Sequence, residues 1–153
     1  MDWVIRRAIE ADVAEIVALL ADDALGSQRE TPDNLASYLA AFALLDRDPN
    51  QFLAVMSAEG RVIGTMQLNY LLGLSHQGAV RAQIEAVRIA ADLRGQGLGG
   101  ELIAWGIAQA RARNCHLVQL TSHASRLAAH HFYERLGFSA THTGFKLNLH
   151  DTH

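Results

Sequence analysis

The sequence predicts an α/β (α+β) fold in which a mixed β-sheet carries helices on both faces. Three observations lead to this fold class. Along the chain, β-rich runs alternate with runs whose apolar residues recur at helical spacing. Two of the β-rich runs are joined by a three-residue turn signal, which is typical of a hairpin. Further on, a strand leads into a glycine-rich turn and then a helix, so strands and helices follow one another as in a layered domain.

Composition limits the class of protein. The chain has 153 residues, half of them hydrophobic, which predicts one domain over residues 1–153 with a sizeable core. No apolar run approaches the roughly 20 residues of a membrane span, and the N-terminus lacks a signal-peptide layout. The single cysteine, Cys115, indicates a reducing compartment, and the net charge of −3 argues against nucleic-acid binding. We therefore expect a cytoplasmic enzyme acting on a small molecule, without a membrane or nucleic-acid partner.

The first half of the chain starts with a short strand over residues 4–8. A helix is expected over 11–21 from the spacing of its apolar residues. Residues 22–30 are polar and predict an irregular connection. Thr31 and Pro32 read as a helix cap followed by proline at the first helical position, opening a helix that runs to about Leu45.

The middle of the chain predicts a hairpin and the strand that precedes the glycine turn. The hairpin strands are residues 51–57 and 61–70, joined by Ala-Glu-Gly. Residues 73–78 form a connector, and residues 79–89 form the next strand.

After the glycine turn the pattern continues to the end of the chain. A helix over 98–112, a strand over 115–121 and a helix over 126–136 are expected, with Ser125 as the cap of the last helix. Further strands are expected through Leu149.

The glycine-rich turn at residues 94–100, Arg-Gly-Gln-Gly-Leu-Gly-Gly, is the most informative segment. It joins the strand over 79–89 to the following helix, so several unpaired backbone N–H groups stand at a helix start, where partial positive charge collects. Glycines let a ligand approach this backbone closely, and Arg94 adds a full positive charge. The turn therefore predicts a site for a phosphate-bearing cofactor.

Two common phosphate motifs do not fit this turn. An ATP-type P-loop needs Lys and then Ser or Thr after its last glycine, whereas Gly100 is followed by Glu101. The spacing of the glycines satisfies the dinucleotide pattern G-x-G-x-x-G, but five residues separate it from its strand. The next strand also lacks the acidic residue that this pattern requires at its end.

A third class fits. Arg94-x-x-Gly97-x-Gly99 resembles the acetyl-CoA signature of the GNAT superfamily of N-acetyltransferases. Downstream, residues 129–138, Ala-His-His-Phe-Tyr-Glu-Arg-Leu-Gly-Phe, resemble the A-x-x-F-Y-x-x-x-G-F segment that closes the domain in that superfamily. The two motifs stand in the expected order and spacing. The resemblance covers most of the chain, strongly over residues 83–149.

The resemblance implies a mostly antiparallel sheet in which a central parallel strand pair splays apart to seat acetyl-CoA. The strand before the turn would pair with the pantetheine arm, the turn would bind the pyrophosphate, and a tyrosine of the second motif would lie near the cofactor sulfur. The cofactor-binding residues expected in this way are Val87, Arg88, Ile89, Arg94, Gly95, Gln96, Gly97, Leu98, Gly99, Gly100 and Tyr133.

Two residues are candidates for proton transfer. Tyr133 matches the family tyrosine that protonates the departing thiolate, and a phenol with a reference pKa near 10 suits that task; the alternative is an aromatic that only packs beside Phe132. Glu85 shares strand parity with Val87 and Ile89, so an unbulged strand would turn it to the same face, as the base or as a contact for the acceptor amine. A bulge would reverse its direction.

Four further residues bear on the site. Arg126 occupies the position where relatives often have an asparagine that contacts the cofactor, so that role is not transferred. The adjacent His130 and His131 diverge on a helix, and no metal site is expected. His123 follows a strand near the expected cleft and is a weaker candidate for contact with the acceptor or cofactor.

The sequence predicts an N-acetyltransferase that moves an acetyl group from acetyl-CoA to a primary amine, with direct attack in a ternary complex. A small-molecule acceptor is favoured, bound by residues 25–30, the helix carrying Tyr38 and the connector after Asn69. Arg29 could bind a carboxylate, and Asp22, Asp23 and Glu30 could attract a cationic amine. The alternatives are an acetyltransferase acting on proteins or peptides and a non-catalytic acyl-CoA-binding module. The family resemblance also allows a homodimer.

Overall fold

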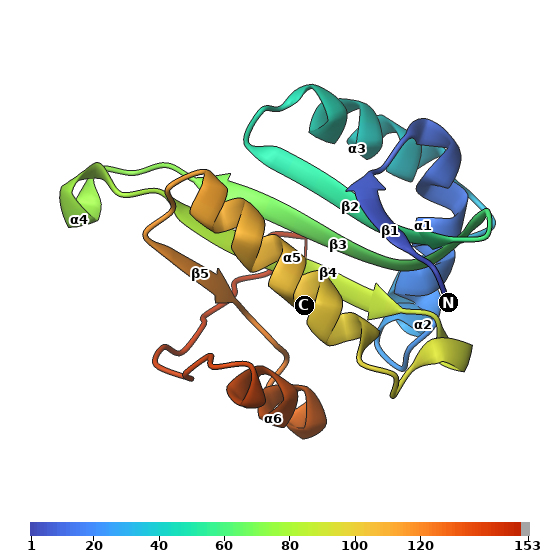
Figure 1. Ribbon diagram of the computed structural model, residues 1–153. Coiled ribbons are helices and arrows are strands. Elements are labelled where there is room, and N and C mark those ends of the chain that lie inside the picture. Colours follow the sequence, from blue (N-terminus) through green and yellow to red (C-terminus); the bar gives the residue numbers. More distant parts are fainter. Residues whose placement is uncertain (151–153) are drawn as a thin grey trace. The chain divides into compact units, whose positions relative to one another are not determined.

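A computed structural model describes residues 1–150 (Figure 1), and the chain divides into a first unit, Met1–Leu120, and a second that begins at Thr121. The elements of the first unit are β1 (Val4–Arg7), η1 (Glu10–Asp12), α1 (Val13–Ala21), α2 (Gly26–Arg29), α3 (Ala36–Arg47), β2 (Gln51–Ala58), β3 (Arg61–Leu71), α4 (Ser75–Gly78), β4 (Arg81–Ile89), η2 (Ala91–Leu93), α5 (Leu98–Ala112) and β5 (Leu117–Leu120). The second unit contains α6 (Leu127–Arg135).

The sheet of the first unit has the strand order β1-β2-β3-β4-β5. All neighbours are antiparallel except β4 and β5, which are parallel. The expected hairpin is confirmed as β2–β3, and its two turn residues, Glu59 and Gly60, have φ of 53° and 76°. Two successive left-handed residues give the turn a twist that matches the twist of the paired strands. The predicted fold class is thus confirmed.

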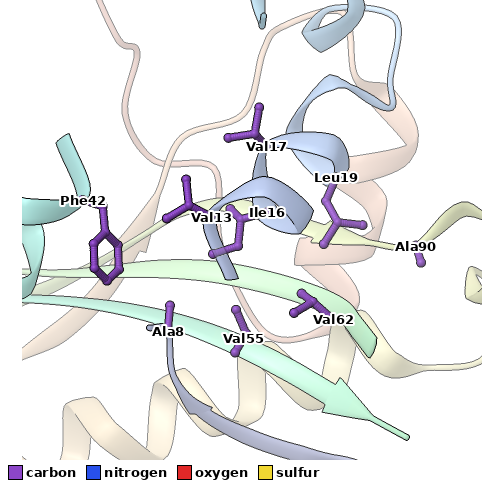
Figure 2. Packing of buried hydrophobic residues seen from close by; sticks show 9 residues of the cluster. All are labelled: Ala8, Val13, Ile16, Val17, Leu19, Phe42, Val55, Val62 and Ala90. Atoms are coloured by element: carbon purple, nitrogen blue, oxygen red, sulfur yellow. The ribbon is translucent and has the colours of Figure 1, made fainter. Parts of the chain in front are cut away.

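Helices cover both faces of this sheet (Figure 1). On one face α5 packs closely on β3 and β4. The close approach is seen at Gly106, where an added Cβ would lie 3.0 Å from the Met66 side chain. On the other face α1 and α3 enclose the apolar cluster shown in Figure 2. Its members are Ala8, Val13, Ile16, Val17, Leu19, Phe42, Val55, Val62 and Ala90. The sheet is therefore the middle layer, with apolar packing on each side.

The helix expected from Pro32 begins four residues later, at Ala36. The reason is the local hydrogen bonding of the segment before it. The N–H of Thr31 donates to Tyr38 Oη at 2.8 Å, and Asn34 Oδ1 accepts from the N–H of Ala36 at 3.2 Å. Thr31 is therefore not the cap: the N-cap residue of α3 is Leu35, and Asn34 before it bonds the first N–H of the helix.

Two connections expected to be irregular contain short helical turns. Residues 22–30 include α2, where the N–H of Gly26 donates to Asp23 Oδ1 at 2.6 Å. The connector at 73–78 includes α4, in which His76, Gln77 and Gly78 have φ of 55°, 62° and 76°. A side chain that accepts a backbone hydrogen bond and a run of left-handed residues are both local features, and hydrophobic periodicity does not predict them.

The strands expected through Leu149 are wrong for the part of the chain that the structure describes, because residues 137–150 contain no strand. Phe145, Leu147 and Leu149 alternate as in a strand but are 92%, 85% and 84% exposed. Alternation supplies only the side-chain pattern, whereas a strand also requires a hydrogen-bonded neighbour. No helix within residues 1–150 is long and apolar enough to cross a membrane.

Candidate active site

The parallel strand pair separates partway along β4. β4 and β5 pair only from Arg81 with Leu117 to Ile84 with Leu120. Within the described residues, the last five residues of β4, Glu85 to Ile89, have no β5 partner, and Glu85, Arg88 and Ile89 pair with β3. This segment contains the predicted residues Val87, Arg88 and Ile89, and the carbonyls of Val87 and Ile89 accept hydrogen bonds from the side chains of Arg88 and Arg94.

A bulge interrupts β4 at the start of this segment. Thr65 pairs with Arg88 and Gln67 with Glu85, so two residues of β4, Ala86 and Val87, stand opposite one residue of β3. Ala86 has φ of 54°, the left-handed conformation that such an extra residue adopts. Of the two alternatives expected for Glu85, the bulged strand is therefore the one observed.

The bulge separates the directions of the side chains on either side of it. Ile89 lies beside Gly64 of β3 and Leu102 of α5, on the face of the sheet that α5 covers. Glu85 instead lies on the opposite face, where Gln83 donates to its carboxylate. The carboxylate consequently stands at the point where β4 and β5 part, and it is exposed.

The glycine turn stands at the far end of the same strand. Gly95 and Gly97 have φ of 80° and 83°, a conformation that residues with a Cβ rarely adopt, and Gly97 is the N-cap of α5. Gly97 has no side chain to cap the helix, so the first N–H groups of α5 are available at its start. A Cβ added at Gly95, Gly97 or Gly100 would meet nothing within 4 Å. The turn is therefore open on the side where an anion would approach.

Two arginines tie this region to the loop between α1 and α2. Arg88 Nε lies 2.9 Å from Asp23 Oδ2, with the two side chains 12% and 25% exposed. Arg94 Nε donates to the Ile89 carbonyl at 3.1 Å, and its Nη2 donates to the Asp22 carbonyl at 3.1 Å. Both predicted arginines thus brace the edge of the site in this structure, and both aspartates expected to attract an amine already face an arginine.

An open pocket of 380 Å³ lies on the face of the sheet that carries Glu85. Strand ends supply amides and a carboxylate, and the C-terminal part of α3 and the residue after it supply an apolar wall and a second carboxylate. The lining residues are Leu44, Leu45, Asp48, Gln51, Gln67, Asn69, Leu71, Gln83 and Glu85. Asn69 is only 6% exposed, although it is polar. A floor of half-buried amides around the buried Asn69 indicates a binding surface for a hydrogen-bonding ligand.

The register makes the amides of this floor a row. Gln51 of β2 pairs with Asn69 of β3, Asn69 pairs with Gln83 of β4, and Gln83 pairs with Gln119 of β5. One amide from each of four strands therefore lies side by side. Sequence reasoning missed this row. The available signal was a glutamine or asparagine at a core-facing position of each of four β-rich runs.

The second unit carries the remaining candidates. Tyr133 lies on α6, and its ring centroid is 5.2 Å from that of Phe132 and 6.1 Å from that of Phe138. The expected Ser125 cap is wrong, because Arg126 is the N-cap residue of α6 and Ser125 Oγ instead lies 2.7 Å from His123 Nδ1. The first unit therefore brings together the predicted residues from Glu85 to Gly100, while Tyr133 belongs to the aromatic cluster of the second. Among the described residues no group of three or more His, Cys, Asp or Glu side chains is arranged to hold a metal ion.

A mostly antiparallel sheet whose one parallel pair separates beside a glycine-rich helix start defines the class of acetyltransferases. Comparison with known families bears this out: the profile of the acetyltransferase (GNAT) family matches residues 13–138. The chain belongs to this family.

Similar proteins with described activities act on small amino compounds. The aminoalkylphosphonate N-acetyltransferase of Salmonella typhimurium is 31% identical over 98 residues, which are 64% of this chain and 63% of that protein's length. The L-methionine sulfoximine/L-methionine sulfone acetyltransferase of Pseudomonas aeruginosa is 30% identical over 135 residues, which are 84% of this chain and 77% of that protein.

Among solved structures, a protein described as a transcriptional regulator from Bacillus halodurans C-125 superimposes with a TM-score of 0.93 at 41% sequence identity. The match covers 97% of this chain and all of the other.

Proposed function

We propose that this chain is an N-acetyltransferase that moves the acetyl group of acetyl-CoA to a primary amine of a small molecule, with direct attack while both substrates are bound. The observation that carries the proposal is the end of β4. It has no β5 partner, it carries Glu85 at its start, and it leads into the open glycine turn of α5. Membership of the acetyltransferase family supports the same activity.

Acetyl-CoA is proposed to bind along this edge. The part of β4 from Val87 to Ile89, which has no β5 strand beside it, would pair with the pantetheine arm as an added strand. The N–H groups from Gly95 to Gly100 would hold the pyrophosphate, because the positive end of the α5 dipole favours anions. The open space at the three turn glycines supports this assignment, since a phosphate can approach the backbone there without meeting a Cβ.

Three groups would then divide the chemistry. Glu85 removes a proton from the ammonium of the acceptor, directly or through water, so that the amine nitrogen can form a bond with the thioester carbon. A main-chain N–H at or near Val87 donates to the carbonyl oxygen as it gains charge. The carbon–sulfur bond breaks, and Tyr133 gives its phenolic proton to the departing thiolate.

The pocket beside Glu85 is the proposed acceptor site. Its lining contains two carboxylates, Asp48 and Glu85, and no Lys, Arg or His among the described residues. This charge balance attracts an amine in its ammonium form. The relatives that acetylate aminoalkylphosphonates and methionine sulfone support an acceptor of similar size.

The test is release of free thiol from acetyl-CoA in the presence of single acceptors. The panel comprises aminoalkylphosphonates, methionine sulfone, other amino acids, polyamines, aminoglycosides and short peptides. We expect release with one class of small amine, and a fall of at least about tenfold in kcat for both Tyr133→Phe and Glu85→Gln, since a general acid or base contributes about 10²- to 10⁴-fold. Peptide-only turnover would instead identify a protein acetyltransferase.

A second candidate is a module that binds acyl-CoA without turnover. The similarity to a protein described as a transcriptional regulator favours it. Calorimetry separates the two functions: tight binding of acetyl-CoA with no thiol release from any acceptor would support the binding module and contradict the transferase.

A further inference from the structure

A line of four hydrogen-bonded side chains crosses the parallel strand pair and ends on Glu85. Arg81 Nη1 donates to Gln119 Oε1 at 3.1 Å, and Gln119 Nε2 donates to Gln83 Oε1 at 2.8 Å. Gln83 Nε2 then donates to Glu85 Oε1 at 2.5 Å. The four side chains share one face, because Gln83 and Gln119 are register partners and the other two alternate with Gln83 along β4.

The two ends of the line determine the orientation of both amides. The guanidinium of Arg81 can only donate hydrogen bonds, so Gln119 must turn its oxygen toward it. The carboxylate of Glu85 when ionised can only accept, so Gln83 must turn its NH₂ toward it. With both ends defined, the middle bond can only run from the NH₂ of Gln119 to the oxygen of Gln83. Every bond therefore points from the cation to the carboxylate.

Such a directed line restricts the carboxylate in a way that local packing does not. Glu85 is exposed and follows directly on the last residue of β4 that pairs with β5. The bonds of a line polarise one another, and the one that reaches the carboxylate is charge-assisted. The line engages Oε1 of the carboxylate, and Glu85 also lines the 380 Å³ pocket.

We propose that Arg81, Gln119 and Gln83 are positioning residues that hold the Glu85 carboxylate in one orientation toward the acceptor amine. This role rests on the proposed function of Glu85 as the group that takes the amine proton. Orientation matters because a misplacement of about 1 Å at the reacting groups can cost about 10²-fold in rate.

Gln119→Glu is the sharpest variant because it preserves size and keeps an oxygen for Arg81. It removes the N–H that donates to Gln83. Gln83 can then satisfy the introduced carboxylate only by turning its own NH₂ toward it, which points its oxygen at Glu85. Gln119→Leu removes both bonds. Gln109→Glu on α5 is the matched control, with the same change of charge outside the line.

For both Gln119 variants we expect kcat to fall by about tenfold or more, with an unchanged KM for acetyl-CoA and an unchanged melting temperature. A purely structural role for Gln119 predicts the opposite pattern, with Gln119→Glu behaving as wild type. Wild-type kcat in both variants would overturn the proposal. Absence of turnover in the wild-type enzyme would overturn the proposed function instead.

Crystal structures of the wild type and Gln119→Leu, both without acceptor, decide the positioning role independently of turnover. We expect Glu85 in one rotamer in the wild type and in several rotamers in the variant. The same single rotamer in both proteins would overturn the proposal.

Discussion

Gly26 illustrates a residue whose identity is set by backbone contact. It begins α2, and a Cβ at this position would lie 1.8 Å from the Leu20 carbonyl oxygen, which belongs to the backbone of α1. Glycine is required here by proximity to another backbone and not by a left-handed φ, since only the absence of a side chain lets the two segments approach.

We predict that Gly26→Ala lowers the free energy of unfolding by about 2–3 kcal/mol, because backbone atoms have to shift to relieve the overlap. Urea denaturation followed by circular dichroism measures the change. Gly73→Ala is the matched control: a Cβ there would meet nothing within 4 Å, so its midpoint should stay near that of the wild type. Equal midpoints for both variants would contradict the prediction.

Asp12 is a buried charge whose partners are local in sequence. Both of its oxygens accept from Arg6, at 2.8 and 3.1 Å, and Oδ2 also accepts from the N–H of Ile9 at 2.8 Å. The hydrogen bonds from Arg6 hold the pKa of Asp12 below its ordinary value, against the opposing effect of burial. A carboxyl whose pKa is lower in the folded state binds a proton more readily when unfolded, so its contribution is complete above the unfolded pKa and is lost as the pH falls through the folded pKa.

We therefore predict that Asp12→Asn is less stable than the wild type by about 1–3 kcal/mol at pH 7, the usual loss for a hydrogen bond to a charged group. The difference should narrow as the pH falls below about 4, where the unfolded chain begins to bind the proton at this carboxyl, and should vanish once the folded protein binds it too. Urea titrations at several pH values test this, with the exposed Asp33→Asn as control. A difference that stays constant down to the acid limit would contradict the assignment.

At the scale of elements, the start of α5 combines two requirements that can be separated by substitution. Gly97 needs its left-handed φ for the turn, whereas Gly100 lies within the helix, where a Cβ would meet nothing within 4 Å. Nothing in the folded chain therefore requires glycine at position 100. A phosphate bound at the proposed site would require it, because a Cβ would stand in its way.

Gly100→Ala is predicted to raise the free energy of unfolding by about 0.5–1 kcal/mol, because alanine loses less backbone entropy than glycine in a helix. The same Cβ should obstruct the phosphate, so the Kd for acetyl-CoA should rise by about tenfold, equivalent to about 1.4 kcal/mol. Thermal denaturation and calorimetry give the two quantities. Ala108→Gly, on the same helix, should lower stability and leave the Kd unchanged. An unchanged Kd in Gly100→Ala would show that the pyrophosphate does not bind at this turn.

The elements also differ in how well the sequence predicted them. The residue patterns predicted the hairpin, α5 and β4 within two residues of their observed bounds. The start of α3 depended on the turn from Thr31 to Asn34 that precedes it, and the side-chain direction of Glu85 depended on the single extra residue at Ala86. Both are choices between local geometries of similar composition, which hydrophobic periodicity does not distinguish.

At the scale of the whole molecule, two short motifs were sufficient to identify the family. The glycine turn at residues 94–100 and the aromatic segment at 129–138 are contiguous and tied to backbone geometry, so their residues can be recognised in the sequence. The apolar alternation after Gly144 was equally visible. It did not produce a strand in residues 137–150, because pairing requires a neighbouring strand as well as a pattern.

The sequence by itself thus determined the family, the mixed sheet and the candidates from Glu85 to Gly100, since each rests on a local pattern of side chains or glycines. The tertiary structure alone decided that β4 separates from β5 after Ile84 and that a bulge turns Glu85 away from Ile89. It also brought Gln51, Asn69, Gln83 and Gln119 into one row. These residues come from four strands as much as 68 positions apart, from Gln51 to Gln119. Strand register, which depends on how all the neighbouring strands pack together, is what places them side by side.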